Sequence, residues 1–251
     1  MSSIRIAAAQ SASVAGDVAA NVAIHCRFIN AAAANGVDLL LFPELSLCGY
    51  ELPLLGACTL KPGDAALLPI AELVARTQMT VIVGAPVTSQ SGRPHIGAIT
   101  FLPDGTASVY CKQYLHAGEE VFATPGEIGA LSQPLGAERY SLAICADTAQ
   151  EQHASAASAS GASLYLASVL VSESGYASDA ANLQRYAERH RLGVLMANHG
   201  GPSGGYVTAG RSAFWSPGGE LVVAAPGVGG YLVIATGGGS DWSGGLVNVE
   251  V

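Results

Sequence analysis

Lysine is nearly absent from this sequence, since only Lys61 and Lys112 occur among 251 residues. Charged residues of all kinds make up 12% of the chain and half of the residues are apolar, which excludes an intrinsically disordered protein. The formal net charge of −8 argues against nucleic acid or an anionic membrane surface as a partner. Because lysine is not used here to keep the surface soluble, the position of each lysine is informative.

Metal-binding and nucleotide-binding patterns are absent as well. The chain has five cysteines, an odd number, and no C-x-x-C pair, so we expect neither a disulfide framework nor a zinc site. Its six histidines show no H-x-H or H-E-x-x-H spacing, and no G-x-x-x-x-G-K-[ST] loop occurs. We therefore predict no metal and no cofactor, and free thiols that favour a cytoplasmic location.

No apolar run approaches the roughly 18 residues that a membrane span requires. The apolar stretch Ile6–Ala9 is too short for the hydrophobic region of a secretory signal, and Asp17 follows soon after it. We therefore expect no membrane partner.

Apolar runs that predict strands alternate with segments that predict helices. Strands are predicted at Ile4–Ala9, Val37–Phe42, Val81–Val87, Ile96–Leu102, Ala107–Lys112, Arg139–Ile144, Ser163–Ser168, Val194–Ala197, Arg211–Trp215, Glu220–Ala225 and Tyr231–Thr236. Helices are predicted from Asp17 to about Asn35, and at Ala65–Thr77, Ala149–Ser160 and Asp179–Arg191. This alternation predicts a layered α/β architecture, and the lack of a linker predicts one domain over residues 1–251. The tail from Gly237 to Val251 is expected to pack poorly on its own, and either to dock on a partner subunit or to fray.

Three apolar runs end in reactive side chains. Residues 39–43 lead to the carboxylate of Glu44, residues 107–111 to the ammonium of Lys112, and residues 140–144 to the thiol of Cys145. An ordinary thiol is mostly protonated at neutral pH, so a nucleophilic cysteine needs a base or a nearby cation. Glu44 can supply the base and Lys112 the cation, which favours a cysteine-dependent amide hydrolase.

The turn after Cys145 can contribute to the same chemistry. The chain leaves the predicted strand there and enters a helix near Ala149, so the backbone N–H of Ala146 can point at a developing oxyanion, together with Lys112. The structural alternative is that Cys145 is a buried small hydrophobic residue, which is also our interpretation of the other four cysteines.

These residues carry a resemblance to a known family. The segments 42–50, 110–115, 119–126 and 144–147 resemble, in order, the glutamate, lysine, second-glutamate and nucleophile motifs of the nitrilase superfamily, the carbon–nitrogen hydrolases. Segments 161–167, 197–198, 210–212 and 216–219 are similar to its later signatures. The resemblance therefore covers nearly the whole chain.

The resemblance implies a four-layer α-β-β-α sandwich that forms homodimers or larger homo-oligomers. It implies Cys145 as nucleophile, Glu44 as general base and Lys112 as stabiliser of the tetrahedral intermediate. A second active-site glutamate is also implied. We assign it to Glu119 rather than Glu120, because Glu119 precedes Pro125 by the six residues usual in the family.

Departures from the family pattern bear on the substrate. No arginine follows shortly after Cys145, which argues against a clamp for a substrate carboxylate. Ala146 replaces a larger residue, which predicts a roomier pocket, and the Trp-Glu pair of true nitrilases is missing. The glutamate motif is most similar to that of the glutaminase domains attached to NAD synthetases. We therefore expect a small-molecule linear amide as substrate and a carbon–nitrogen bond as the bond cleaved.

Several alternatives remain at this point. His116, His153 or His199 can pair with Cys145 as in papain-like enzymes. Ser203 lies in a G-x-S-x-G pattern, but glycines and a proline surround it and no histidine follows it in the chain. The same pocket can also belong to a catalytically idle binding protein or to an acyltransferase that passes the thioester to an amine.

Overall fold

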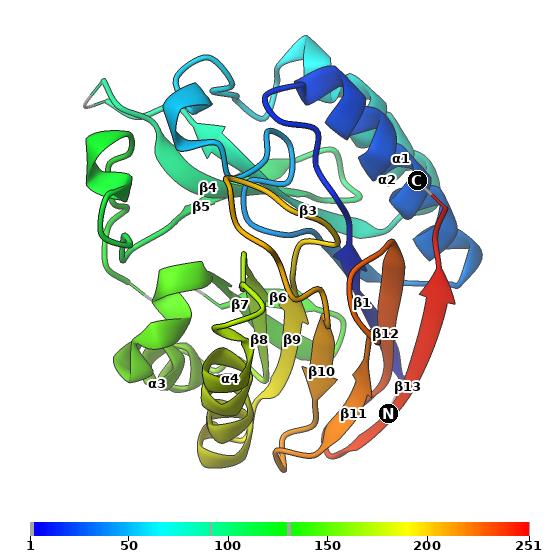
Figure 1. Cartoon of the computed structure of the whole chain (residues 1–251). Coiled ribbons are helices and arrows are strands. Elements are labelled where there is room, and N and C mark those ends of the chain that lie inside the picture. The colour runs from blue at the N-terminus through cyan, green and yellow to red at the C-terminus, as the bar shows by residue number, and fades with distance from the viewer. Residues whose placement is uncertain (1–2, 91, 130–131, 251) are drawn as a thin grey trace.

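The computed structural model describes residues 3–90, 92–129 and 132–250. Two β-sheets pack face to face, and helices cover the outer face of each (Figure 1). The predicted four-layer α-β-β-α sandwich is confirmed. The reactive strand ends named above lie on both sheets, so the packing of the two sheets brings them together.

One sheet runs in the order β13-β12-β1-β2-β3-β4-β5 within the described ranges. Its strands are β1 (Ile4–Gln10), β2 (Leu39–Leu41), β3 (Thr80–Val87), β4 (His95–Phe101), β5 (Ala107–Cys111), β12 (Tyr231–Gly238) and β13 (Asp241–Asn248). The strands β1, β2 and β3 pair in parallel, and the others join as antiparallel neighbours. The carboxyl ends of β2 and β5 lead to Glu44 and Lys112.

The other sheet runs in the order β11-β10-β9-β8-β7-β6 among the residues described. Its strands are β6 (Gln133–Leu135), β7 (Glu138–Ile144), β8 (Leu164–Ser168), β9 (Gly193–Ala197), β10 (Ala213–Trp215) and β11 (Leu221–Ala224). The central strands β7, β8 and β9 are parallel. The carboxyl end of β7 leads to Cys145.

Helices α1 (Val18–Ala34) and α2 (Leu68–Thr77) cover the first sheet, and α3 (Glu151–Ala159) and α4 (Tyr176–His190) cover the second. The predicted cap at Asp17 is present, since its carboxylate accepts a hydrogen bond from the N–H of Ala20. Short 3₁₀ turns lie at η1 (Leu52–Leu54), η2 (Ala65–Leu67), η3 (Glu119–Val121) and η4 (Cys145–Ala149). The second and third helices therefore begin later than the sequence predicts, at Leu68 and Glu151.

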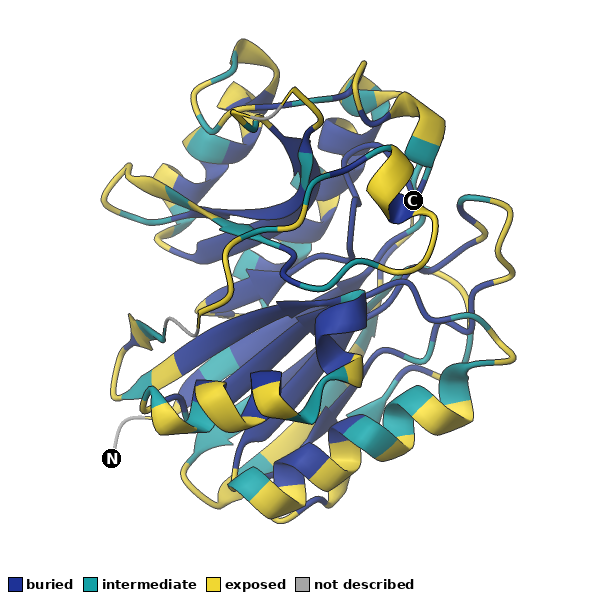
Figure 2. Cartoon of the chain, turned by 90° about the vertical axis from the view of Figure 1, so that its left-hand side faces the viewer, coloured by how far each residue is buried: buried dark blue, intermediate teal, exposed yellow. Residues whose placement is uncertain are grey.

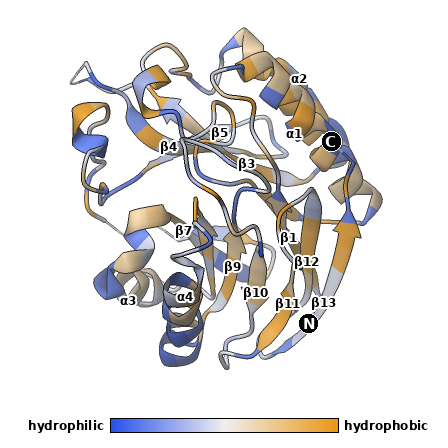
Figure 3. Ribbon diagram, viewed as in Figure 1, coloured by the Kyte–Doolittle hydropathy of each residue, from blue (hydrophilic) through white to orange (hydrophobic). Residues whose placement is uncertain are grey.

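The core consists of three layers, one between the sheets and one beneath each helix pair. Leu39 and Leu41 of β2 point into the layer between the sheets, whereas Leu40 points toward α1 and α2. A strand that is covered on both faces needs apolar side chains at every position, which explains the continuous apolar run of β2. Figure 2 shows buried strands behind helices with exposed outer faces, and in Figure 3 α4 is largely hydrophilic.

The tail beyond Gly237 is a correction to the sequence analysis, because residues 241–248 form the edge strand β13 rather than a poorly packed terminus. Trp242 packs on Phe214 of the other sheet with ring centroids 4.7 Å apart. Gly244 and Gly245 interrupt the alternation of apolar and polar residues by which a strand is predicted from the sequence. A Cβ at Gly244 would lie 2.5 Å from a side-chain atom of Val223, so this close approach requires glycine.

Candidate active site

Four side chains from different elements meet between the two sheets. Glu44 follows β2, Lys112 follows β5, Glu119 opens η3 and Cys145 follows β7. Lys112 and Glu119 are completely buried and Glu44 is 1% exposed, so ordinary surface ion pairing does not explain them. Buried charges of this kind require partners, and these residues are one another's partners.

Lys112 is the centre of the cluster. Its Nζ donates hydrogen bonds of 2.7 Å to Glu44 Oε1 and of 2.7 Å to Glu119 Oε1. Burial by itself lowers the pKa of Lys112, but the negative groups around it, Glu44 first, raise that pKa overall. The side chain therefore remains an ammonium group at neutral pH, held in one place by two carboxylates.

Glu44 is suited to take up a proton. Burial raises its pKa to about 7, with Lys112 opposing and Glu119 reinforcing the rise. Its Oε2 is buried and receives no hydrogen bond from an N–H or O–H group of the described residues. Of the two neighbours that lower this pKa, Lys112 has the larger effect and Cys145 the smaller. A carboxylate near its own pKa at neutral pH can both accept and return a proton.

Glu119 is held more firmly than Glu44. Besides Lys112, it accepts a hydrogen bond of 2.5 Å from the Tyr50 hydroxyl at Oε1 and one of 2.8 Å from the backbone N–H of His116 at Oε2. Its neighbour Glu120 is exposed and instead accepts from the N–H of Gly118. Of the two adjacent glutamates, only Glu119 lies in the cluster.

Cys145 occupies a strained turn at the end of β7. Its φ of +42° is unusual for a residue with a side chain, and such conformations cost about 1 kcal/mol or more and persist only where the surroundings enforce them. Asp147 enforces this one. Its Oδ2 accepts from the N–H of Ile144 at 2.9 Å, and its Oδ1 accepts from the N–H groups of Gln113 and Tyr114 at 3.0 and 2.9 Å. Asp147 therefore ties the cysteine turn to the segment directly after Lys112.

The sulfur is a protonated thiol in the resting protein. Burial raises the pKa of Cys145 well above its usual range, Glu44 adds to the rise, and Lys112 opposes it. Sγ lies 3.2 Å from His116 Nε2 and 3.6 Å from the carbonyl oxygen of Leu170. The nucleophile must therefore lose its proton at the moment of reaction, which requires a base beside it.

The three histidines considered as partners of Cys145 have different positions. His116 contacts the sulfur. His153 bonds to the hydroxyl groups of Tyr110 and Tyr165, both at 2.8 Å. His199 is buried, and its Nε2 donates to the backbone carbonyl of Glu44 at 2.7 Å, so it contacts the main chain of Glu44 rather than the sulfur. The structure thus leaves only His116 as a papain-like partner.

Ser203 has a structural contact instead of a catalytic one. Its Oγ accepts a hydrogen bond of 2.8 Å from the N–H of Tyr50, and so joins the 200–210 loop to the turn beyond Glu44. Tyr50 and Asp147 are the site residues that the sequence analysis missed. Tyr50 ends the glutamate motif and Asp147 follows Cys145 by two positions, so their places in the motifs were the available signal.

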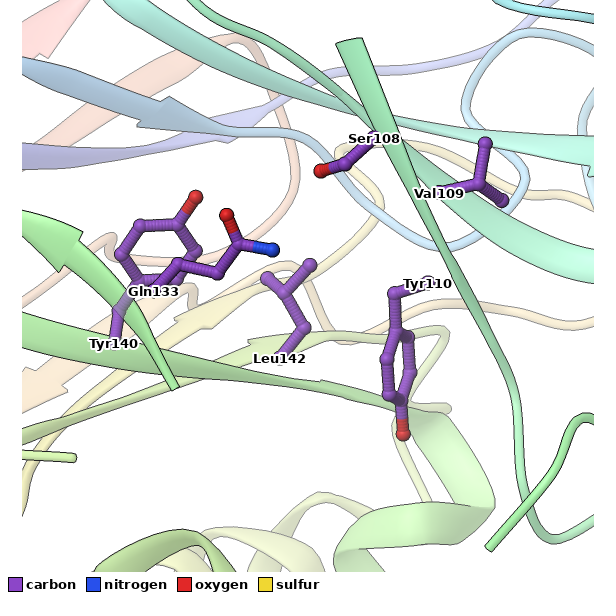
Figure 4. Close-up of a pocket in the computed structure, with 6 residues that line it drawn as sticks. All are labelled: Ser108, Val109, Tyr110, Gln133, Tyr140 and Leu142. Carbon is purple, nitrogen blue, oxygen red and sulfur yellow. The ribbon is translucent and has the colours of Figure 1, made fainter. Parts of the chain in front are cut away.

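Two hollows lie beside β5. A cavity of about 40 Å³ lies between β5 of one sheet and β6 and β7 of the other. It is lined by Ser108, Val109, Tyr110, Gln133, Tyr140 and Leu142 (Figure 4). A groove of about 840 Å³ runs along the outer side of β5, past Cys111 and Pro125. Neither includes Glu44, Lys112 or Cys145. The charges and hydrogen bonds, rather than these hollows, define the site.

Among the described residues, no group of His, Cys, Asp or Glu side chains is arranged to hold a metal ion.

Comparison with known families identifies the family of this chain. The family model described as carbon-nitrogen hydrolase matches residues 5–236. The chain therefore belongs to the carbon–nitrogen hydrolase family, and the resemblance to the nitrilase superfamily is confirmed.

Solved structures of an amidase from Nesterenkonia sp. are similar to this chain. One is 26% identical, with a TM-score of 0.84, and covers 93% of this chain and 89% of the amidase. A mutant of that amidase in complex with butyramide is 24% identical, with a TM-score of 0.85 and coverage of 93% and 90%. Another mutant, with the same identity and TM-score and coverage of 93% and 89%, shows the acetamide moiety of fluoroacetamide added covalently at the active-site cysteine. The Nesterenkonia protein thus binds short linear amides and has a reactive cysteine.

Proposed function

We propose that this protein hydrolyses the carbon–nitrogen bond of a small, linear, non-peptide amide through a thioester on Cys145. The observation that carries the proposal is the buried contact of one ammonium group, Lys112, with the two carboxylates of Glu44 and Glu119, beside a thiol on a strained turn. A buried ion cluster costs desolvation energy, and a packed apolar core would be as stable without it. Retention of the cluster next to a nucleophile is the arrangement that acyl chemistry needs.

Acylation begins with transfer of the Cys145 proton to Glu44. The sulfur attacks the amide carbonyl carbon, and the carbonyl oxygen becomes an oxyanion that Lys112 and the N–H of Ala146 stabilise. The C–N bond then breaks as Glu44 returns its proton to the leaving nitrogen. Ammonia or an amine departs, and the acyl group remains on the sulfur.

Deacylation repeats these steps with water. Glu44 removes a proton from water, the resulting hydroxide adds to the thioester carbon, and the same two donors hold the oxyanion. The C–S bond breaks and Glu44 returns the proton to the sulfur. Glu119 keeps Lys112 charged and in place throughout, which is how a second carboxylate can serve a reaction that needs only one base.

The Nesterenkonia complexes support the choice of substrate class, because butyramide and fluoroacetamide are short linear amides. The lack of an arginine after Cys145 supports an uncharged acyl portion. We further propose that the chain acts as a single domain over residues 1–251, as a homodimer or larger homo-oligomer, and in the cytoplasm. No helix in the described part of the chain is long and apolar enough to span a membrane.

The proposal is tested by incubating the protein with acetamide, propionamide, butyramide and glutamine and measuring the ammonia released. Cys145→Ala is expected to lose on the order of 10⁶-fold in kcat, as loss of a nucleophile does elsewhere. Cys111→Ala removes a partly buried thiol outside the cluster and is the matched control, with unchanged turnover expected. Full activity of the Cys145 variant would refute the mechanism.

Intact-mass measurement during turnover separates the remaining alternatives. A mass increase equal to the acyl group, lost with Cys145→Ala, is expected for the thioester. Absence of both the adduct and ammonia with every amide favours an idle binding protein. An adduct that disappears faster when an amine is added indicates acyl transfer.

A further inference from the structure

His116 lies at the mouth of the site, on the segment between Lys112 and η3. Its backbone N–H donates to Glu119 Oε2, which fixes the main chain to the buried cluster. The residue as a whole is exposed, yet Nε2 of its ring lies 3.2 Å from Cys145 Sγ. The imidazole therefore stands between the nucleophile and solvent, a position that the mechanism above does not use.

We infer that His116 is a further catalytic residue, whose Nε2–H donates a hydrogen bond to Cys145 Sγ and stabilises the thiolate that forms when the proton leaves for Glu44. The catalytic part of this inference rests on the proposed amidase function. The contact itself can be tested without any amide substrate.

The groups around the sulfur indicate that His116 is a donor rather than an acceptor. Glu44 and Glu119 are both carboxylates that disfavour negative charge on the sulfur, and Lys112 is the opposing cation. The thiol proton has an acceptor other than His116 in the carbonyl oxygen of Leu170, 3.6 Å from Sγ, and the buried Glu44 Oε2 of the same cluster receives no N–H or O–H donor from the described chain. Once that proton has moved, a ring at 3.2 Å can contact the thiolate favourably only through an N–H group.

The charge state of the ring fits this role. Burial lowers the pKa of His116, and Lys112 lowers it further, although Glu119, Asp179 at the start of α4 and Asp147 in η4 act in the opposite direction. The ring is then neutral at neutral pH and carries a single N–H. A neutral donor stabilises the thiolate without adding a second permanent cation beside Lys112.

This hydrogen bond adds no proton transfer to the reaction. In acylation the thiol proton moves to Glu44, the S–C bond forms, and Nε2–H stays on the imidazole. In deacylation the C–S bond breaks and the sulfur again carries negative charge until Glu44 returns the proton. His116 thus acts twice in each cycle, both times on the sulfur.

The test is the alkylation rate of Cys145 by iodoacetamide, followed by mass spectrometry of the peptide that contains this cysteine. His116→Leu removes the donor with little change in size, and His116→Gln keeps an N–H donor of similar reach. At pH 8 we expect His116→Leu to slow alkylation about tenfold, the size expected for one hydrogen bond to a charged group, and His116→Gln to stay within about threefold of the parent.

A pH profile of the same rate separates donation from shielding. We expect the apparent pKa of the thiol to be higher in His116→Leu, with the same limiting rate at high pH. Glu44, Lys112, Glu119, Asp147 and Asp179 are unchanged in both variants, so their titration is common to the comparison. Alkylation of His116→Leu at or above the parent rate at every pH would overturn the inference and show that the ring only covers the sulfur.

Amide turnover by the same variants distinguishes the two proposals. Slower alkylation together with a matching fall in kcat/KM supports both. Slower alkylation in a protein that hydrolyses no amide leaves the sulfur contact standing and refutes the catalytic role together with the hydrolase proposal. Unchanged alkylation with normal hydrolysis refutes the inference alone. Should His116→Leu fail to fold, His116→Asn, whose amide is too short to reach the sulfur, replaces it with the same expectations.

Discussion

The raised pKa of Glu44 gives a prediction that links activity to stability. Burial holds this pKa at about 7 in the folded protein, against an ordinary value of 4.5. Between these two values the folded chain keeps a proton that the unfolded chain has lost, so stability decreases as the pH rises through this window. At 1.36 kcal/mol for each pH unit, the loss reaches about 3 kcal/mol by pH 8.

Glu44→Gln avoids this loss, because a neutral amide imitates the protonated acid and its oxygen can still accept the hydrogen bond of Lys112. Relative to the parent, the free energy of unfolding of the variant should therefore increase by under about 1 kcal/mol at pH 5 and by about 3 kcal/mol at pH 8. Urea unfolding followed by tryptophan fluorescence measures both values. Glu120→Gln is the matched control, and its difference from the parent should stay within about 0.5 kcal/mol at both pH values.

The same variant should lose amidase activity, since it has no base for the thiol proton. In the parent protein, kcat/KM should fall tenfold for each pH unit below about 7, as the fraction of ionised Glu44 decreases. A stability gain of equal size at pH 5 and pH 8, or one that shrinks with rising pH, would refute the buried raised-pKa acid. It would also remove the reason to expect the fall of kcat/KM below about pH 7.

Three further changes have defined outcomes. Lys112→Met leaves Glu44 and Glu119 without their cation, so the free energy of unfolding should fall by about 3 kcal/mol at pH 8 and by less at pH 5. The kcat should fall by at least about 10²-fold. An equal loss of stability at both pH values would contradict this account. Tyr50→Phe removes one donor to Glu119 and should cost about 1 to 2 kcal/mol in urea unfolding, whereas no change would show that the short hydrogen bond contributes nothing. Trp242→Ala should cost about 2 kcal/mol through lost packing while the alkylation rate of Cys145 stays constant, and a change in that rate would mean that β13 shapes the site.

Much of the cluster can be predicted from the sequence, because apolar runs mark where the strands end. Glu44 and Cys145 directly follow continuous runs, and Lys112 is one of only two lysines. Glu44 and Cys145 follow β2 and β7, which have parallel neighbours, whereas Lys112 follows the antiparallel edge strand β5. The choice of Glu119 over Glu120 depended on motif spacing, and it agrees with burial, because only Glu119 lies in the cluster.

Other features depend on contacts between distant segments and have no local signal. The hydrogen bonds from the N–H groups of Gln113 and Tyr114 to Asp147 join residues more than thirty positions apart in the sequence, across two sheets. The approach of His116 to the sulfur depends on how the loop leaves Lys112. The edge strand β13 was mistaken for a loose tail because its glycines carry no strand preference, although Gly244 fits there only by lacking a side chain.

The scarcity of lysine also has a practical consequence for handling the protein. Lys112 is sealed inside the molecule, whereas Lys61 is exposed. Amine-directed reagents such as succinimidyl esters will therefore modify Lys61 and spare the buried ammonium group as long as the protein stays folded. Among the lysine side chains, a dye is therefore directed to Lys61, and labelling of Lys112 would itself report unfolding.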